Sequence, residues 1–415
     1  MKRLMSFILA ITLVMGITAC TRTDTTDLMR DISPRAVNVL QDMQAGSAAA
    51  TDFGVRLIQT GMEKEKNTLI SPLSVYYALA MTANGAVGET LEQMEQLLGM
   101  EVADLNVYML AYLNRLPEGK NYKLSMANSI WFRDDPNFVV EQSFLQTNAD
   151  HYGAGIYKAP FDETTRKNIN NWVKEHTDGM IPNILEGIPR EAVMYLINAL
   201  SFDARWDKEY KDHQIWEGSF TTEEGVRQNV EMMHSQEHTY LEDGMATGFV
   251  RYYKDRKYAF VALLPNEGIP LSQYVQSLTG ESLRYMIQNT QNVTVSTAIP
   301  KFETEYQVDM ADVLQKMGMT AAFDWRVADF SRLGSYNVEG MNLFINRVLH
   351  KTHISVSEQG TQAGAATVVE IAPGSAAPME EIKEVILDRP FLYMIIDCEN
   401  QFPIFIGTMM TVNGQ

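Results

Sequence analysis

Cysteine is scarce in this sequence: its 415 residues include only two, Cys20 and Cys398. No intrachain disulfide can form once Cys20 is modified, so the fold must hold without such a cross-link. Cys398 ends the apolar run FLYMIIDC, and no neighbour in the sequence would activate a thiolate. We therefore expect Cys398 to be a small buried side chain and not a nucleophile.

Positive charge is also in short supply. The chain has 34 lysines and arginines against 52 aspartates and glutamates, which gives a formal net charge of -18. A surface of this kind repels phosphate backbones. The sequence also has no basic run with interleaved aromatic residues, so we expect no nucleic-acid partner.

Long apolar runs are missing after the first twenty residues, which argues against a membrane-spanning helix in the rest of the chain. Residues 1–20 read MKRLMSFILAITLVMGITAC, with a basic start at Lys2 and Arg3. The apolar stretch that follows is too short to span a bilayer comfortably, and the pattern is typical of a secretory signal.

The last four residues of this segment, Ile17 to Cys20, resemble the lipobox at which bacterial lipoproteins are cleaved and the cysteine is acylated. We expect a lipoprotein signal peptide over residues 1–20, a lipid such as palmitate on Cys20, and a short tether over residues 21–33. The protein would then be exported and lipid-anchored at the bacterial cell envelope, in the outer membrane. A plain signal with a chance cysteine is the alternative and would leave no anchor.

Motifs of self-contained enzymes are missing as well. The sequence has no G-x-S-x-G around a serine, no Walker loop and no G-x-G-x-x-G. In the stretch HSQEH, His234, Glu237 and His238 follow the H-x-x-E-H arrangement of inverted zinc peptidases. Zinc needs that motif on a helix with a third ligand, whereas the flanks alternate like a strand and no later cluster supplies the ligand. We expect no metal, no cofactor and no enzyme activity.

The remaining chain, residues 34–415, is expected to form one large α+β domain, because helices and strands come in blocks without internal repeats. Ser71 and Pro72 begin a predicted helix in SPLSVYYALAMTANGA, and Gly99 ends a second one in GETLEQMEQLLG. Strands are predicted for LSMANSIWF, YAFVALLP and VTVSTAIPKF, and PFLYMIID with FPIFIGTMM predicts a hairpin around residues 399–401.

One stretch, GTQAGAATVV at residues 360–369, combines very small side chains with a strand-like alternation. A flexible linker would not place Thr or Ala at every second position from Thr361 to Thr367. The pattern therefore indicates a segment built for the inside of a sheet.

Six consecutive motifs resemble those of the serpin family, from about Ala48 to Met410. They are NTLISPLSVYYAL, NWVKEHTDGMIPNIL, INALSFDARW, IPKFETEYQVDM, VLHKTHISVSEQGTQAGAAT and the terminal pair DRPFLYMIID and FPIFIGTMM. The resemblance implies the serpin fold, with three β-sheets, about nine helices and an exposed reactive-centre loop near the C-terminus.

The resemblance also implies a function. A serine protease would cleave the loop, and the freed loop would insert into the central sheet and trap the acyl-enzyme covalently. We expect the partner to be an extracellular or periplasmic serine protease of elastase-like or subtilisin-like specificity, with a cysteine protease as a further option, and the inhibitor to be a monomer. The alternative is a non-inhibitory serpin acting as a binding or chaperone protein, but such members carry bulky, charged or proline-containing hinges.

The resemblance assigns roles to individual residues. The expected hinge consists of Glu358, Gly360, Thr361, Gln362, Ala363, Gly364, Ala365, Ala366 and Thr367. In inhibitory relatives the cleaved bond follows about sixteen residues after the first hinge glutamate. Counting from Glu358 gives the bond between Gly374 and Ser375, with cleavage at Met379 as the second candidate.

Two polar groups complete the expected site. Trp206, Lys301 and Glu358 match the family's breach, where insertion starts, and we expect an ion pair between Lys301 and Glu358. Ser71, Ser74, Asn198 and His350 match the shutter, the cluster beneath the place where the central strands part. Ordinary helix capping and core hydrogen bonding would also account for these residues.

Overall fold

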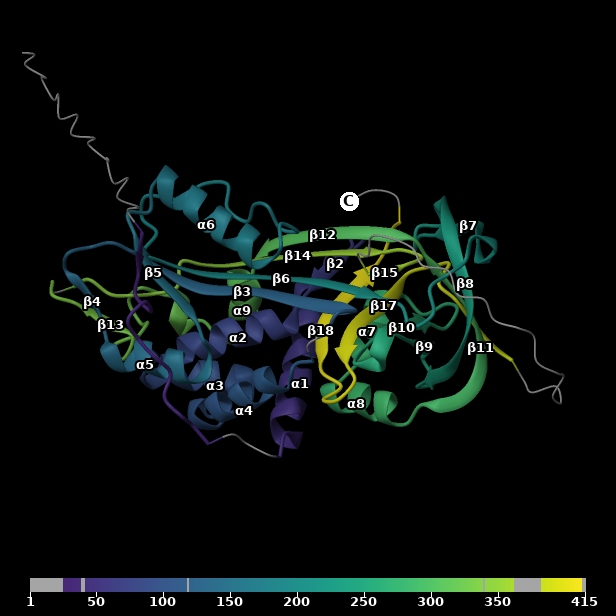
Figure 1. Ribbon diagram of the computed structural model, residues 1–415, viewed down its shortest axis with the longest axis horizontal. Coiled ribbons are helices and arrows are strands. Elements are labelled where there is room, and N and C mark those ends of the chain that lie inside the picture. Colours follow the sequence, from purple (N-terminus) through teal and green to yellow (C-terminus); the bar gives the residue numbers. More distant parts are fainter. Residues whose placement is uncertain (1–24, 39–41, 118, 339, 362–381, 413–415) are drawn as a thin grey trace, which may run out of the picture.

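The computed structural model describes residues 25–38, 42–117, 119–338, 340–361 and 382–412. Within these ranges it contains nine α-helices and three β-sheets, which confirms the predicted α+β class. A large sheet runs along the long axis, with helix α6 (Glu163–His176) above it and α2 (Pro72–Ala83) beneath it (Figure 1). A second sheet fills the right-hand end of the molecule.

The two helices predicted from the sequence are both present, as α2 and as the helix that follows it. Ser71 caps α2, since its hydroxyl oxygen accepts a hydrogen bond from the Ser74 backbone N–H at 3.1 Å. Gly99 ends the next helix in the left-handed conformation, with φ of 72°. The other helices are α1 (Gln44–Gly61), α3 (Gly88–Leu98), α4 (Val102–Arg115), α5 (Gln142–His151), α7 (Leu271–Ser277), α8 (Gly280–Gln288) and α9 (Ala311–Lys316).

The large sheet has seven strands. Their order is β1 (Thr26–Asp27), β5 (Gly155–Ala159), β3 (Tyr122–Arg133), β6 (Met194–Arg205), β15 (Gly360–Thr361), β14 (Arg347–Val356) and β12 (Phe302–Asp309). Every residue of α2 is buried, because this helix packs against β3 and β6 on one side and against the second sheet on the other. The core of the molecule therefore lies directly beneath the centre of the large sheet.

The second sheet contains nine strands. The path is β16 (Lys383–Ile386), β11 (Gln291–Pro300), β8 (Arg227–Glu242), β9 (Ala246–Tyr252), β10 (Tyr258–Pro265), β17 (Phe391–Asp397), β18 (Pro403–Met409) and β2 (Thr68–Ile70), and β7 (Ile215–Thr221) pairs with β8. The antiparallel pairing of β17 with β18 confirms the predicted terminal hairpin. A small third sheet joins β4 (Phe138–Val140) to β13 (Gly334–Tyr336).

The N-terminal part of the described chain departs from the expected tether of residues 21–33. Residues Thr26 and Asp27 pair as β1 with the edge strand β5, and the Arg35 guanidinium forms an ion pair with Asp150 at 2.6 Å. Apolar side chains between them, including Leu28 and Ile32, pack on the core. Strand pairing and apolar burial therefore hold residues 26–33 on the body. Among the described helices, none is both long and apolar enough to cross a membrane.

Candidate functional site

The centre of the large sheet is joined along only part of its length. Strands β6 and β14 pair in parallel from Tyr195 with Arg347 to Ser201 with His353. Beyond that point the short strand β15 lies between them, and it pairs antiparallel with both neighbours. The two central strands are therefore closed at one end and separated at the other.

A tight turn brings β15 into this opening. The Ser357 N–H donates to the Gly360 carbonyl at 2.9 Å, and the Gly360 N–H donates back at 3.3 Å. Gly360 has a φ of 152°, and a Cβ at this position would lie 2.0 Å from the Ala204 carbonyl oxygen. Only glycine fits without moving backbone, so this position of the expected hinge requires the glycine that the sequence has.

Thr361 is the first side chain to enter between the strands. It is fully buried, and its hydroxyl shares a 2.6 Å hydrogen bond with the hydroxyl of Tyr253. This burial agrees with the inward face expected for Thr361. The other small hinge residues, from Gln362 to Thr367, lie outside the described residues, as do the candidate bond between Gly374 and Ser375 and the second candidate, Met379.

Trp206 and the segment that follows it hydrogen-bond to the backbone of the turn. The indole Nε1 of Trp206 donates to the Ser357 carbonyl at 2.8 Å, and the Trp206 backbone N–H donates to the Gln359 carbonyl at 3.0 Å. The Tyr210 backbone N–H donates to the Glu358 carbonyl at 2.9 Å. Three consecutive residues of the turn therefore hydrogen-bond to one segment after β6.

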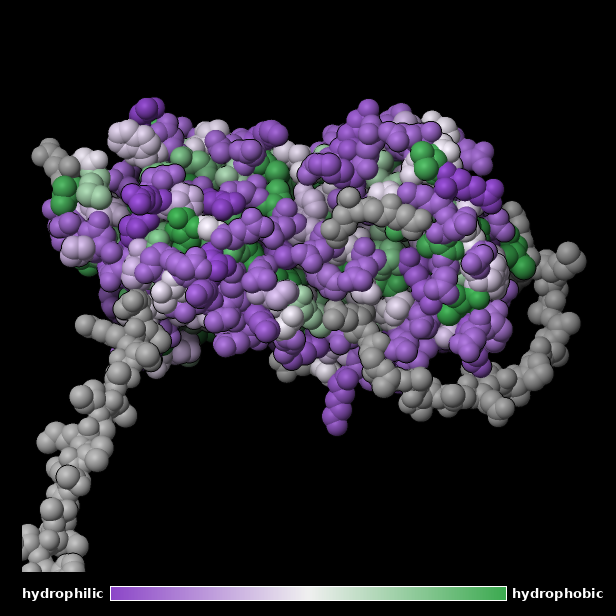
Figure 2. All heavy atoms as spheres, turned by 90° about the horizontal axis from the view of Figure 1, so that it is seen from above, coloured by the Kyte–Doolittle hydropathy of each residue, from purple (hydrophilic) through white to green (hydrophobic). Residues whose placement is uncertain are grey.

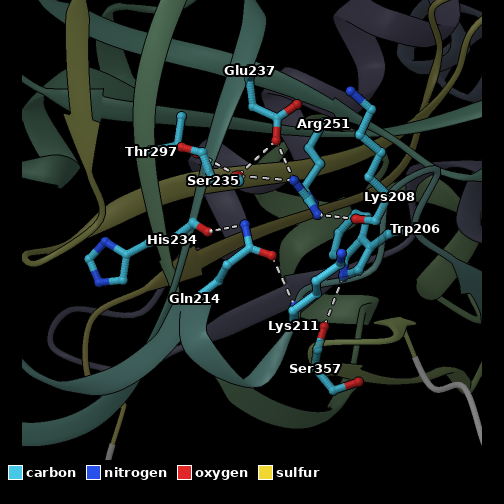
Figure 3. A network of polar contacts seen from close by, with 10 residues as sticks. All are labelled: Trp206, Lys208, Lys211, Gln214, His234, Ser235, Glu237, Arg251, Thr297 and Ser357. Atoms are coloured by element: carbon cyan, nitrogen blue, oxygen red, sulfur yellow. Dashed lines mark hydrogen bonds and ion pairs between the residues drawn. The ribbon is translucent and has the colours of Figure 1, made fainter. Parts of the chain in front are cut away.

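A buried arginine supports this segment from the second sheet (Figure 3). Arg251 on β9 is 4% exposed, and its guanidinium pairs with the Glu237 carboxylate and donates to Ser235 and to the Lys208 carbonyl. The guanidinium also lies 3.9 Å from the ring centroid of Tyr210 and 5.0 Å from that of Trp206. Arg251 thus connects β8 and β9 to the segment that holds the turn.

The predicted ion pair between Lys301 and Glu358 is present, with 3.0 Å between the ammonium and a carboxylate oxygen. Burial works against the charge of Lys301, but Glu358 and Glu231 outweigh it and raise the pKa of the lysine. The pKa of Glu358 is lowered because its carboxylate accepts a hydrogen bond from the Glu358 backbone N–H and pairs with Lys301. The Glu358 side chain is 36% exposed, so solvent screens the pair and its contribution to stability is small.

The residues expected in the shutter meet halfway along the ladder of β6 and β14. His350 Nδ1 lies 2.7 Å from the Asn198 side-chain oxygen, and the Ser71 N–H donates to His350 Nε2 at 3.0 Å. Ser74 joins the row because its hydroxyl donates to Asn128 at 3.0 Å. One row of side chains therefore links α2 to three adjacent strands of the sheet.

This arrangement keeps His350 neutral. An Nε2 that accepts the Ser71 N–H has no proton, and full burial lowers the pKa of His350 to about 3. The side-chain amide nitrogens of Asn128 and Asn198 are buried without a hydrogen-bond partner. Buried polar groups that lack partners cost free energy, so part of this row is unfavourable in the closed sheet.

Two residues considered in the sequence are His234, from the rejected zinc motif, and Cys398. His234 lies on strand β8 and stacks on Trp216 with 3.6 Å between ring centroids, and no group of side chains in the described ranges could hold a metal ion. Cys398 is partly buried, and burial raises the pKa of its thiol to about 12. A thiol of this kind is protonated near neutral pH and is a poor nucleophile.

Comparison with known proteins decides the family. The family model described as Serpin (serine protease inhibitor) matches residues 48–412. The chain belongs to the serpin family. A serpin-like protein from Thermococcus kodakarensis is 31% identical over 87% of this chain and 84% of its own length. The leukocyte elastase inhibitor of Bos taurus is 30% identical over 88% of this chain and 99% of its own.

Solved structures show the same fold. The thermophilic serpin tengpin in its native state is 44% identical, covers 94% of this serpin and all of its own chain, and superposes with a TM-score of 0.89. Tengpin in its latent state is 42% identical over 91% of this serpin and all of its own chain, with a TM-score of 0.80. This serpin therefore has the serpin fold, and its arrangement agrees better with the native state.

Several residues of the site were not identified from the sequence. Asn128 and Tyr253 lie in ordinary strand or turn sequences, and nothing local marks Arg251 as a buried cation. Glu237 was considered only as part of the rejected zinc motif. Their roles arise from contacts between elements far apart in the chain, which no spacing along the sequence could indicate.

Proposed function

We propose that this serpin inhibits serine proteases by presenting its reactive-centre loop as a substrate. The protease serine attacks the carbonyl carbon of Gly374, the bond to Ser375 breaks, and the new amine leaves with the C-terminal segment. The chain up to Gly374 stays esterified to the enzyme. Residues from Gln362 onward then insert between β6 and β14 before water can hydrolyse the ester.

The pairing of β15 is the observation that carries this proposal. Gly360 and Thr361 already run antiparallel to β6 and to β14, in the register that an inserted strand would continue. Thr361 is buried there, so residues of the same parity, such as Ala363 and Ala365, would follow it inward. Their small side chains fit between the layers without prying the sheet apart.

Insertion must also open the ladder between β6 and β14. The inserted strand would part His350 from Asn198, which lie opposite one another in that ladder. Movement of the strands would give the unpartnered amide of Asn198 access to new acceptors. The shutter row thus controls how readily the sheet opens, and the breach controls where opening begins.

The relatives support the proposal in two ways. One of them is named as an inhibitor of leukocyte elastase, which fits the shallow specificity pocket that a glycine before the cleaved bond would require. Tengpin has been crystallised in a native and in a latent state, so one chain of this family adopts two folded forms. The non-inhibitory alternative is disfavoured by the small residues of this hinge.

The direct test mixes the purified protein with elastase, subtilisin, trypsin and a cysteine protease, followed by denaturing gels. We expect a band at the summed mass with elastase or subtilisin that survives boiling. Mass analysis of the released C-terminal peptide fixes the cleaved bond. If the loop is cleaved but none of the proteases gives a covalent band, the protein is only a substrate and the proposed inhibition is refuted.

We also propose that export and a lipid on Cys20 place the inhibitor at the bacterial cell envelope. Support comes from the sequence of residues 1–20 alone. Metabolic labelling with a palmitate analogue should label the wild type and not a Cys20→Ala variant. Recovery of unlabelled wild type in the soluble fraction would contradict the anchor.

A further inference from the structure

Four large apolar side chains are exposed at the end of the molecule that carries β4 and β13. Exposed fractions are 51% for Trp325, 45% for Val327, 40% for Val338 and 44% for Met341. We call these four residues the end patch. Figure 2 shows hydrophobic side chains at the surface of the left-hand end, where Figure 1 places β4 and β13.

Hydrogen bonds from Asn342 connect the two segments that carry the end patch. The Asn342 side-chain amide donates to the Trp325 carbonyl at 3.0 Å and also to the Ala328 carbonyl. The Met341 N–H donates to the Val338 carbonyl at 3.3 Å. The segment that carries Val338 and Met341 is therefore joined directly to the segment that carries Trp325 and Val327.

The N-terminal strand lies close to this surface. Thr26 pairs with Lys158 of β5, and the Lys158 ammonium donates to the Phe138 carbonyl of β4 at 2.9 Å. Phe138 pairs in turn with Tyr336 of β13, two residues before Val338. A short path of direct contacts therefore connects the beginning of the described chain to the end patch.

Chain length limits how far a lipid on Cys20 could be from the body. Five residues lead from Cys20 to Thr25, whose hydroxyl accepts a hydrogen bond from Asn168 of α6 at 2.9 Å. Five residues span at most about 18 Å even when fully extended. An acyl chain on Cys20 would therefore hold this end of the molecule against the bilayer.

The local charge allows such a contact. The chain as a whole carries a net charge of -18, whereas residues 324–342 contain three acidic side chains and two basic ones. One of the basic groups, the Arg326 guanidinium, lies 5.4 Å from the ring centroid of Trp325. Tryptophan with a neighbouring arginine is suited to the interface between lipid headgroups and acyl chains.

We propose that the end patch rests on a lipid bilayer when the protein is anchored through Cys20. The inference rests on the proposed lipid anchor and adds a second point of contact. Two contacts set the orientation of the folded domain relative to the bilayer. β7, β8 and β11 lie at the right-hand end in Figure 1, and β16, which follows the candidate cleavage bond in the sequence, pairs with β11 there. The end of the molecule that carries β11 and β16 then faces away from the membrane.

The test uses the full lipidated protein in phosphatidylcholine vesicles whose acyl chains carry bromine, which quenches nearby tryptophan. Trp325 is 51% exposed and Trp216, on β7 at the opposite end, is 52% exposed, so the two provide a matched comparison. Quenching should persist in a Trp216→Phe variant and fall at least threefold in a Trp325→Phe variant. A double variant, Val338→Ser with Met341→Ser, should weaken quenching without lowering the melting temperature.

Vesicle flotation separates the two ways in which this inference can fail. If the protein floats with the vesicles and Trp325→Phe leaves quenching unchanged, the anchor stands and the membrane contact of the end patch is refuted. If the wild type does not float, the lipid anchor fails and the contact falls with it. A doubled mass in gel filtration that Trp325→Ser abolishes, without quenching in vesicles, would overturn the proposal in favour of self-association.

Discussion

Cleavage of the reactive-centre loop should make this serpin more stable, which is the opposite of what a nick does to most proteins. Cutting between Ala372 and Glu381 frees the chain after Thr361 to enter the gap between β6 and β14. The exposed-loop form would then be a kinetically trapped state. We expect the melting temperature of the nicked protein to exceed that of the intact protein.

The structure sets the size of the effect. Seven residue pairs, from Tyr195 with Arg347 to Ser201 with His353, join β6 to β14 and would be separated. An inserted strand of about ten residues satisfies about twenty backbone groups, a net gain of about thirteen hydrogen bonds. At about 0.5 to 1.5 kcal/mol each, less the entropy of ordering the loop, the gain is on the order of 10 kcal/mol as an upper estimate.

Such a gain converts into a measurable shift. An unfolding entropy of about 2.1 cal/mol/K per residue over roughly 380 residues gives about 0.8 kcal/mol/K, so the melting temperature should rise by up to about 12 °C. Differential scanning calorimetry of intact and elastase-nicked protein measures the shift. Mass spectrometry of the C-terminal peptide confirms that the loop alone is cut.

A pair of adjacent substitutions provides the control. Ala365 shares the parity of the buried Thr361, whereas Ala366 has the opposite parity. Ala365→Arg should abolish the rise after nicking, because a buried arginine would have no partner, and Ala366→Arg should leave it in place. An unchanged melting temperature in the nicked wild type, or equal behaviour of the two variants, would refute insertion.

Three further predictions concern Gly360 of the hinge, His350 of the shutter, and Arg251, which supports the segment after β6. Gly360→Ala should lower the stability in urea titrations by about 1 to 3 kcal/mol, because its Cβ would meet the Ala204 carbonyl; an unchanged midpoint would contradict this. Burial lowers the pKa of His350 to about 3, so the unfolded chain binds a proton that the folded chain rejects. Stability should therefore fall as the pH drops from 6.5 towards 3, by about 2 to 3 kcal/mol at pH 4.5, and less in His350→Gln. Arg251→Ala, which leaves the largely buried Glu237 carboxylate with only the Ser235 hydroxyl as a partner, should cost about 3 to 5 kcal/mol, against less than about 1 kcal/mol for Glu358→Ala, and equal losses would argue against the support role of Arg251.

Capping residues and apolar runs predicted those helices and strands whose formation depends mainly on neighbouring residues in the sequence. The Ser71 cap and the Gly99 terminus fix their helices through contacts within a few residues, and the runs rich in β-branched and aromatic residues at 390–397 and 402–410 are joined by a short loop and pair as a hairpin. The ion pair of Lys301 with Glu358 was predicted as well, but only through resemblance to a family whose members share this geometry.

Other features could not be predicted because they depend on where distant segments meet. Residues 26–33 resemble a polar tether in composition, yet strand β5 offers an unpaired edge to which they add. Arg251 resembles any strand residue until β8 and the segment after β6 enclose its guanidinium. Burial and partners of this kind are properties of the assembled core.

The sequence by itself determined that residues 360–369 could become an inner strand, because small side chains at every second position follow from the order of residues alone. Only the tertiary structure decided where that strand would enter. The opening exists because β6 and β14 run parallel for seven residue pairs and then part around Gly360 and Thr361. The distance between two strands that are about 150 residues apart in the chain is set by the packing beneath them, and no local pattern encodes it.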